Sequence, residues 1–396
     1  MKPLPNLKRA AWLNEPRLQD VMAVITRGGA EVRVAGGAVR NALSGVPIAD
    51  VDLATTMLPD DVMRICKAAG FGVHPTGFEH GTVTIVNKGV PFEVTTLRRD
   101  VETDGRRAVV AFTTGWAEDA VRRDFTMNAM YCDATGKIYD FTNGYADLLR
   151  NRVRFVGDAN KRIKEDYLRI LRFFRFHARF GKGAPDRVGL AACTKLKSGL
   201  KKISAERIRQ EMFKLVVAPR SIPTLKKMVG SGVLKIIIPH TDEWRVIGRL
   251  PHDAVLRLFV LAKKPENLKD DLRISNVEAQ RIENLIVAPD LTPRLKPQEQ
   301  RALLYHLGAQ AWVDAIQLAW AKGRAAKTNQ KWQDLLDLQK RWPIPKLPIN
   351  GKDLLQAGVA SGPHMGEVLR DLEDWWVAND FAPTREELLE RLKNDA

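Results

Sequence analysis

The stretch Gly36–Thr55 reads GGAVRNALSGVPIADVDLAT and carries the clearest signal for the fold. It follows EVRVA at Glu31–Ala35, an alternating run that is typical of a β-strand. After the glycine pair, Ala38–Leu43 predicts the start of a helix, and Asp50–Ala54 (DVDLA) predicts a second short strand. A strand, a glycine turn, a helix and an acidic strand together indicate a mixed α/β domain.

The same stretch contains candidate groups for phosphate chemistry. Side chains two residues apart on a strand point to one face, so we expect the carboxylates of Asp50 and Asp52 to converge. Mg²⁺ prefers carboxylates together with phosphate oxygens and water. The pair Gly36 and Gly37 permits close approach of the backbone to a phosphate, and Arg40 adds a charge-assisted contact. The stretch lacks the G-x-G-x-x-G spacing of dinucleotide-binding folds.

The sequence beyond this stretch predicts a hairpin. Thr82–Val86 and Phe92–Thr96 are β-rich runs, and Asn87–Gly89 between them is a turn signal. Strands with few helices between them predict a small mixed sheet rather than a doubly wound one. Glu93, on the second run, supplies a third carboxylate if its strand lies beside the acidic one.

A second polar cluster is RRDFTMNA at 122–129. Two arginines beside Asp124 can pair with triphosphate oxygens while the acid holds them. An ordinary surface charge cluster has the same composition.

The run EDYLRILRFFR at 165–175 carries a row of charges. Asp166, Arg169, Arg172 and Arg175 recur at every third residue, so on a helix neighbouring members lie within reach of each other. A charged row in so apolar a helix is costly to bury unless it is paired. A carboxylate beside a guanidinium also matches the Watson–Crick edge of a base. The row therefore indicates either a nucleotide-selecting helix or a structural ladder of ion pairs.

Net charge is concentrated in one part of the chain. The 396 residues carry a net charge of +16, and a chain of this length predicts two or three domains. Residues 150–217 contain 19 Lys and Arg but 6 Asp and Glu, whereas residues 1–140 are neutral. Such a segment suits polyanion binding, with a solvated basic face as the alternative. From about Asp158 onward strand signals nearly vanish, which predicts a long helical body.

Composition excludes several other classes. No run of eighteen apolar residues is present, so the sequence predicts no membrane span. The first twenty residues lack an apolar core and carry acids, which argues against export. Three widely spaced cysteines, Cys66, Cys132 and Cys193, give neither a disulfide framework nor a zinc pattern. We therefore expect a cytoplasmic protein; the sequence does not define its oligomeric state.

Taken in order, the motifs resemble those of one family, the class II (bacterial-type) tRNA nucleotidyltransferases, which are the CCA-adding enzymes and their poly(A) polymerase relatives. The resemblance is strongest over residues 30–215. It rests on GGAVRN with ADVDLAT, TGFEHGTVTI with FEVTTLR, RRDFTMNAMY, YDFTNGYADLLRNRVRFVGD, EDYLRILRFFRF, ISAERIRQEMFKL, and PINGKDLLQAG with SGPHMGEVLRDLEDW.

The resemblance implies an α+β fold with a small mixed-sheet nucleotidyltransferase head of the polymerase-β type and all-helical neck, body and tail domains. It assigns the head to residues 1–145, the neck with a nucleobase-selecting site to 146–217, and a tRNA-binding body and tail to 218–396. The implied reaction adds CCA to the 3′ end of tRNA from CTP and ATP with release of pyrophosphate. It needs Mg²⁺ and no nucleic-acid template.

The resemblance also implies roles for single residues. Asp50 and Asp52 would bind Mg²⁺, and Glu93 would be the third carboxylate. Contacts to the incoming nucleotide are implied for Gly36, Gly37, Arg40, Arg123, Asp124, Asp166, Arg169, Arg172 and Arg175. Support of the site is implied for Asn128, Glu206 and Arg209.

The sequence departs from the family pattern at two places. Asn41 follows Arg40 where the family usually has Asp, which bears on how the glycine turn is braced. After Asp104-Gly105-Arg106 the chain reads RAVVAF, where relatives usually carry a proline and more acids. In this family that loop is linked to the switch from C to A addition, so the departure bears on which bases are added.

Alternative activities stay open on the same scaffold. They are a poly(A) polymerase and a partial enzyme that adds only CC or only A. A non-catalytic RNA-binding protein is disfavoured because the carboxylates and Arg123 occur together. His252-Asp253 suggests an HD phosphohydrolase, but that metal site needs further ligands and only His240 lies near.

Overall fold

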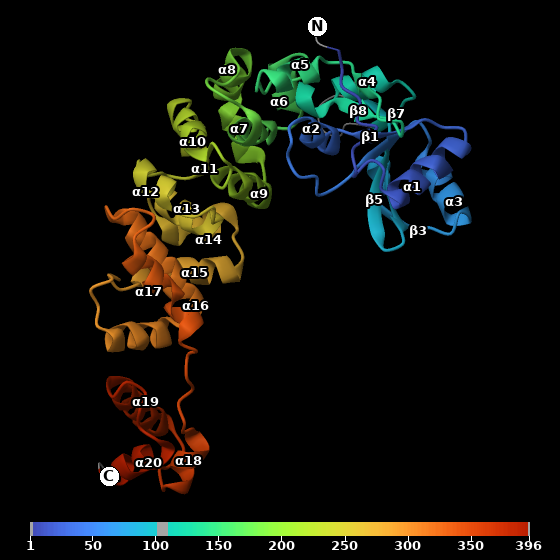
Figure 1. Cartoon of the computed structure of the whole chain (residues 1–396). Coiled ribbons are helices and arrows are strands. Elements are labelled where there is room, and N and C mark those ends of the chain that lie inside the picture. The colour runs from blue at the N-terminus through green and yellow to red at the C-terminus, as the bar shows by residue number, and fades with distance from the viewer. Residues whose placement is uncertain (1–2, 101–109, 395–396) are drawn as a thin grey trace. The chain divides into compact units, whose positions relative to one another are not determined.

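The computed structural model describes residues 3–100 and 110–394 (Figure 1). The chain divides into two compact units, Met1–Ile237 and Ile238–Ala396. All strands of the described ranges lie in the first unit, and the second is helical. The finer boundaries expected near residues 145 and 217 stay predictions.

A mixed sheet forms the head, as the sequence predicts. Its strand order is β3-β4-β5-β2-β1-β8-β9, with β2 and β5 parallel and the other neighbours antiparallel. The strands are β1 (Val32–Ala35), β2 (Leu53–Thr55), β3 (Gly72–Gly77), β4 (Thr82–Asn87), β5 (Val90–Thr96), β8 (Met130–Cys132) and β9 (Ile138–Asp140). A separate antiparallel pair is formed by β6 (Arg98–Asp100) and β7 (Val110–Phe112).

Local sequence explains the edges of this sheet. The predicted hairpin joins β4 to β5 through Lys88 and Gly89, whose φ angles of 48° and 79° suit a tight turn. Helices α1 (Pro16–Arg27) and α3 (Pro59–Ala68) pack on the sheet with their apolar faces. The shorter helices α2 (Gly37–Leu43), α4 (Trp116–Val121) and α5 (Gly144–Leu149) complete the head.

Six helices follow in the first unit. They are α6 (Ala159–Glu165), α7 (Arg169–Phe180), α8 (Arg187–Leu196), α9 (Ala205–Val216), α10 (Ser221–Gly230) and α11 (Leu234–Ile237). Helix α7 packs against α9 and α10. The rings of Phe173 and Phe176 on α7 meet those of Phe155 and Phe125 at centroid distances of 5.5 and 5.3 Å. This aromatic cluster fixes α7 beside the segment that contains Asp124.

The second unit consists of helices around two aromatic cores. They are α12 (Trp244–Arg249), α13 (Ala254–Leu261), α14 (Leu268–Leu272), α15 (Asn276–Val287), α16 (Pro297–Lys322), α17 (Gln330–Arg341), α18 (Gly351–Gln356), α19 (Pro363–Ala378) and α20 (Arg385–Asn394). Trp312 is buried in one core and Trp376 in the other. Within the described ranges, none of the helices has both the length and the apolar character needed to cross a bilayer.

Two predicted elements begin later than the sequence indicated. β2 starts at Leu53, where pairing with Val34 and Val94 begins, so Asp50 and Asp52 lie before the strand and not on it. The charged row is also not wholly helical, because α7 starts at Arg169. Asp166 is extended (φ −152°, ψ 106°) between α6 and α7, and its side chain accepts a hydrogen bond from the backbone of Leu168. Such local bonds compete with helix formation.

Candidate active site

A cavity of about 530 Å³ in the first unit brings most of the predicted site residues together. Those that line it are Gly36, Gly37, Arg40, Asp52, Glu93, Arg123, Asp124, Asn128, Asp166, Arg169 and Arg172. Asp50, Arg175, Glu206 and Arg209 are not among the lining residues. Arg122, the first of the two arginines beside Asp124, lines the cavity, and so do Arg98 and Arg207, which the sequence motifs did not indicate.

The glycine turn brings backbone and guanidinium together. Gly36 has φ 58°, a left-handed conformation that favours glycine. A Cβ atom there would lie 3.0 Å from the carbonyl oxygen of Asn128 and 3.1 Å from Nη1 of Arg123. Only glycine therefore allows Arg123 to approach the start of α2.

Two carboxylates lie side by side at the edge of the cavity. Since Leu53 pairs with Val94 in parallel register, Asp52 and Glu93 are neighbours one residue earlier, and both are exposed. Loss of surrounding water and the charges of Glu93 and Asp50 raise the pKa of Asp52, and Arg123 opposes this. Crowded carboxylates of this kind favour a bound cation.

This donor set suits a metal that shares its ligands with a substrate. Among the residues described, no group of three His, Cys, Asp or Glu side chains is arranged to hold a metal ion by itself. Mg²⁺ usually keeps several waters and binds through one or two carboxylates plus substrate phosphates. The pair of Asp52 and Glu93 beside a phosphate-sized turn fits that mode.

A buried acid, Asp119 on α4, collects donors on the head side of the cavity. Its Oδ2 accepts hydrogen bonds from Nε and Nη2 of Arg123 (3.1 and 3.0 Å), and its Oδ1 accepts one from Nε of Arg122 (2.9 Å). Burial alone would raise the pKa of Asp119, but Arg123, Arg122 and the Tyr131 hydroxyl lower it to about 2. Asp119 was not predicted from the sequence, although an acid three and four residues before two arginines is a usable signal.

A chain of hydrogen bonds connects the head to α7. Arg40 donates to Oδ1 of Asn128 (2.5 Å), and Nδ2 of Asn128 donates to Asp124 (2.9 Å). Asp124 accepts from Nε and Nη2 of Arg172 (2.8 and 2.5 Å). Burial and the charge of Arg175 lower the pKa of Arg40 to about 10, so Arg40 stays charged at neutral pH.

The arginine row on α7 is paired with acids from other elements. Arg175 donates to Glu211 on α9, and Nη1 of Arg172 lies 3.8 Å from the same carboxylate. Arg169 donates to Glu165 (2.6 Å). The members of the row thus do not pair with each other, and the row is anchored by tertiary contacts.

Asp166 and α9 show a similar pattern. The partner of Asp166 is Arg207, with Nη2 to Oδ2 at 2.7 Å, and not Arg169. Glu206 is exposed, Arg209 lies over the ring of Phe213, and the acid of α9 that reaches α7 is Glu211. The helical spacing of Glu211 with the buried Ile208 and Leu215 would have placed it on the inner face.

The first departure from the family pattern has a structural role. Oδ1 of Asn41 accepts from Nε and Nη2 of Arg40 (3.1 and 2.8 Å), and Nδ2 of Asn41 donates to the carbonyl of Pro47 (3.1 Å). Asn41 thus links Arg40 to the loop that leads to Asp50. The second departure, at Asp104-Gly105-Arg106, falls mainly on residues outside the described ranges.

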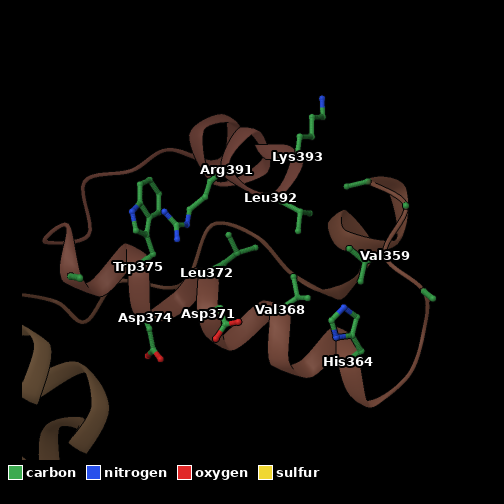
Figure 2. A pocket seen from close by; sticks show the side chains of 14 residues that line it. Val359, His364, Val368, Asp371, Leu372, Asp374, Trp375, Arg391, Leu392 and Lys393 are labelled. Atoms are coloured by element: carbon green, nitrogen blue, oxygen red, sulfur yellow. The ribbon is translucent and has the colours of Figure 1, made fainter. Parts of the chain in front are cut away.

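The second unit contains another cavity and the predicted His252-Asp253 pair, and neither has the cluster of carboxylates and arginines seen in the first unit. A cavity of about 1060 Å³ lies between α19 and α20, where apolar side chains such as Leu372 and Trp375 are flanked by Asp371 and Arg391 (Figure 2). Asp253 caps α13 through the backbone N–H of Leu256 and pairs with Arg281 (3.0 Å), which is a structural role rather than that of an HD metal ligand.

Comparisons with known proteins cover nearly the whole chain. Family models match for the poly A polymerase head domain at 32–154, the RNA- and SrmB-binding site of polymerase A at 186–245, and tRNA nucleotidyltransferase domain 2 at 254–392. The chain is 36% identical to the mitochondrial CCA tRNA nucleotidyltransferase 1 of Danio rerio, over 91% of this chain and 87% of that protein. It is 32% identical to the CCA-adding enzyme of Latilactobacillus sakei, over 94% and 96%.

Structural similarity leads to the same family. The crystal structure of the Bacillus stearothermophilus CCA-adding enzyme in complex with CTP matches with a TM-score of 0.81 and 28% identity, covering 96% of this chain and 98% of that one. The mixed-sheet head, the helical remainder and the ordered motifs agree with these matches. The chain therefore belongs to the CCA tRNA nucleotidyltransferase family, the CCA-adding enzymes.

Proposed function

We propose that the protein adds CCA to the 3′ end of tRNA from CTP and ATP and releases pyrophosphate without a nucleic-acid template. The observation that carries this proposal is one cavity in which two exposed carboxylates face seven arginines. The arginines are Arg40, Arg98, Arg122, Arg123, Arg169, Arg172 and Arg207. Relatives that bear the name CCA-adding enzyme, one of them bound to CTP, support it.

Asp52, Glu93 and Asp50 would hold Mg²⁺ together with phosphate oxygens of the nucleotide. When bound, the metal would act as a Lewis acid and lower the pKa of the attacking 3′-hydroxyl. The raised pKa of Asp52 supports a cation at this point, since a positive charge relieves repulsion among the carboxylates.

The arginines of the head would bind and orient the triphosphate. Arg123 uses Nε and Nη2 on Asp119, so its Nη1 remains directed toward Gly36 and the cavity. Arg122 and Arg40 add positive charge along the same wall. Fixed cations facing the triphosphate neutralise charge that grows on the leaving pyrophosphate, which is the main source of rate in such reactions.

The neck would choose the base. Cytosine and adenine both present an amino group beside a ring nitrogen that accepts a hydrogen bond. A carboxylate such as Asp166 accepts from the amino group, and a guanidinium such as Arg169 donates to the ring nitrogen. Guanine and uracil carry a carbonyl oxygen in place of that amino group. This oxygen and the carboxylate of Asp166 are both hydrogen-bond acceptors, so they would repel each other.

A labelled tRNA transcript that lacks its 3′ CCA tests the function. With Mg²⁺, CTP alone should add two residues, and CTP with ATP should add three. A long A ladder with ATP alone would instead establish a poly(A) polymerase, and two C residues without A would establish a CC-adding enzyme. Absence of extension with intact tRNA binding would overturn the assignment of the carboxylates.

We infer a cytoplasmic location for this reaction. Cys66, Cys132 and Cys193 are buried free thiols in the structure, a state that a reducing compartment maintains. Fractionation of cells that express the chain, followed by immunoblotting, tests the inference.

A further inference from the structure

Three arginines of the nucleotide cavity and Tyr131 donate hydrogen bonds to Asp119. Besides Arg122 and Arg123, the backbone N–H of Arg98 donates to Oδ1 of Asp119 (3.2 Å), and the Tyr131 hydroxyl donates to Oδ2 (2.7 Å). All three arginines line the cavity, whereas Asp119 itself does not. The carboxylate of Asp119, which does not line the cavity, thus connects three arginines that do.

The carboxylate of Asp119 is buried, since the residue is 1% exposed. A buried carboxylate is costly unless charged donors surround it. Here both oxygens are occupied by donors of the wall, so removing the charge leaves Arg122 and Arg123 without the acceptor that orients them. Charge-assisted bonds of this kind are about twice as strong as neutral ones.

Each part of the cavity offers the nucleotide a different contact. In the proposed reaction Asp52 and Glu93 would flank the reacting phosphate, and Asp166 and Arg169 would meet the base edge. The cations of Arg122 and Arg123 remain for the leaving part of the triphosphate. The Nη1 atom of Arg123 lies beside Gly36 at the glycine turn, where it could contact a phosphate.

We propose that Asp119 is a positioning residue for the pyrophosphate part of the incoming nucleotide, acting through Arg122, Arg123 and the backbone of Arg98. The inference rests on the proposed function, because it assigns one substrate part to one group of that site. Asp119 acts through the arginines and does not touch the substrate.

Asp119→Asn tests the proposal, and Asp147→Asn is its matched control. Asp147 is also 1% exposed and accepts hydrogen bonds from Thr126 (2.7 Å) and Arg154 (2.9 Å), but it does not line the cavity. Both variants remove a buried charge from the head of the full-length protein. Only Asp119→Asn replaces an acceptor of the cavity arginines with an amide whose NH₂ faces other donors.

Ligand-binding constants and the melting temperature together distinguish a positioning role of Asp119 from a role in stability alone. With Mg²⁺ present, Asp119→Asn should raise the Kd of CTP and ATP and the inhibition constant of pyrophosphate in parallel, by about tenfold. The KM of tRNA and the C-then-A order should stay unchanged. Asp147→Asn should lower the melting temperature and leave the ligand constants within about twofold. Unequal changes for CTP and pyrophosphate, or equal effects of the two variants, would overturn the proposal.

A milder variant serves if Asp119→Asn does not fold. Tyr131→Phe removes one of the donors to Asp119 and keeps the carboxylate, so the CTP and pyrophosphate constants should rise together by about two- to threefold. Unchanged constants in this variant would contradict the inference. Binding of CTP and pyrophosphate is measured by calorimetry and needs no extension of tRNA. A wild-type chain that binds both but extends no tRNA would sink the proposed function alone.

Discussion

The two walls of the nucleotide cavity use their carboxylates differently. On the head wall, formed by Gly36, Gly37, Arg40, Asp52, Glu93 and Arg123, the carboxylates of Asp52 and Glu93 are exposed side by side, and their like charges raise the pKa of Asp52. On the opposite wall, formed by Asp166, Arg169, Arg172 and Arg207, the acid is already paired, Asp166 with Arg207. Behind this wall, which we call the neck wall, Glu165 pairs with Arg169 and Glu211 with Arg175. Exposed, crowded acids are available to a cation and hence to chemistry, whereas paired acids fix the directions of guanidinium groups. The head wall is therefore suited to reaction and the neck wall to recognition.

The largest effect is expected on the head wall. Asp52→Asn removes the carboxylate beside Glu93, so kcat for C addition should fall by at least about a hundredfold. The control is Asp60→Asn, which changes an exposed acid at the start of α3 and should leave kcat unchanged. Single-turnover extension of labelled tRNA measures the effect. A decrease of only a few-fold in kcat would contradict the assignment of the reaction to the head wall.

On the neck wall the loss should appear in selectivity. Asp166→Ala removes the acceptor proposed for the amino group, so the preference for CTP over UTP in kcat/KM should shrink by about tenfold or more. The metal dependence should stay as in the wild type, because Asp166 pairs with Arg207 and is not among the charges that act on Asp52. Parallel extension assays with each nucleotide measure the ratio. Normal C-then-A selectivity in this variant would show that the base is read elsewhere.

Asp119 predicts a specific acid dependence of stability. Its pKa is about 2 in the folded protein and about 4 when unfolded, so its contribution is present above pH 4 and is lost as the pH falls from about 4 to about 2. The loss is on the order of 2 kcal/mol in the free energy of unfolding. Asp119→Asn cannot titrate, so its urea midpoint should fall less steeply over this range. Equal slopes for both proteins would contradict the pairing.

The smallest effect is expected at Asn41. Asn41→Asp loses the hydrogen bond to Pro47, worth about 1 kcal/mol, and gains an ion pair with Arg40, so the two changes nearly offset each other. The KM for CTP should change by less than about threefold and the melting temperature by a few degrees. Steady-state kinetics and thermal unfolding check both values. A tenfold change would mean that Asn41 tunes the head wall directly.

Sequence predicts the head wall better than the neck wall, for a physical reason. Both strands of the head wall follow from local patterns, the runs Asp50–Ala54 and Phe92–Thr96, and sequence analysis named Asp52 and Glu93 as a possible pair. Their parallel pairing, 41 positions apart, stayed open until the structure showed it. The partners on the neck wall come from distant segments: Arg172 pairs 48 residues away with Asp124, and Arg175 pairs 36 residues away with Glu211. Helical periodicity shows that a charge needs a partner but not which element supplies it.

Short elements were also hidden from sequence analysis. β3, β8 and β9 were not predicted, because strands of three to six residues with glycine or mixed polarity give weak periodicity. Asp166 was assigned to a helix because its spacing fits one. Its side chain accepts a hydrogen bond from the N–H of Leu168, and such local bonds cannot be predicted from the spacing of residues along the sequence.

The aromatic cores of the second unit give the molecule separate optical labels. Seven of the nine tryptophans belong to that unit: Trp244, Trp312, Trp320, Trp332, Trp342, Trp375 and Trp376. Four of the five tyrosines belong to the first unit, and Tyr305 is the exception. Excitation at the red edge of the tryptophan band therefore reports mainly on the helical second unit. Second-derivative absorbance separates the tyrosine bands from the stronger, overlapping tryptophan bands, and the tyrosine bands report mainly on the unit that holds the nucleotide cavity. The melting of each unit can therefore be followed in the unmodified protein.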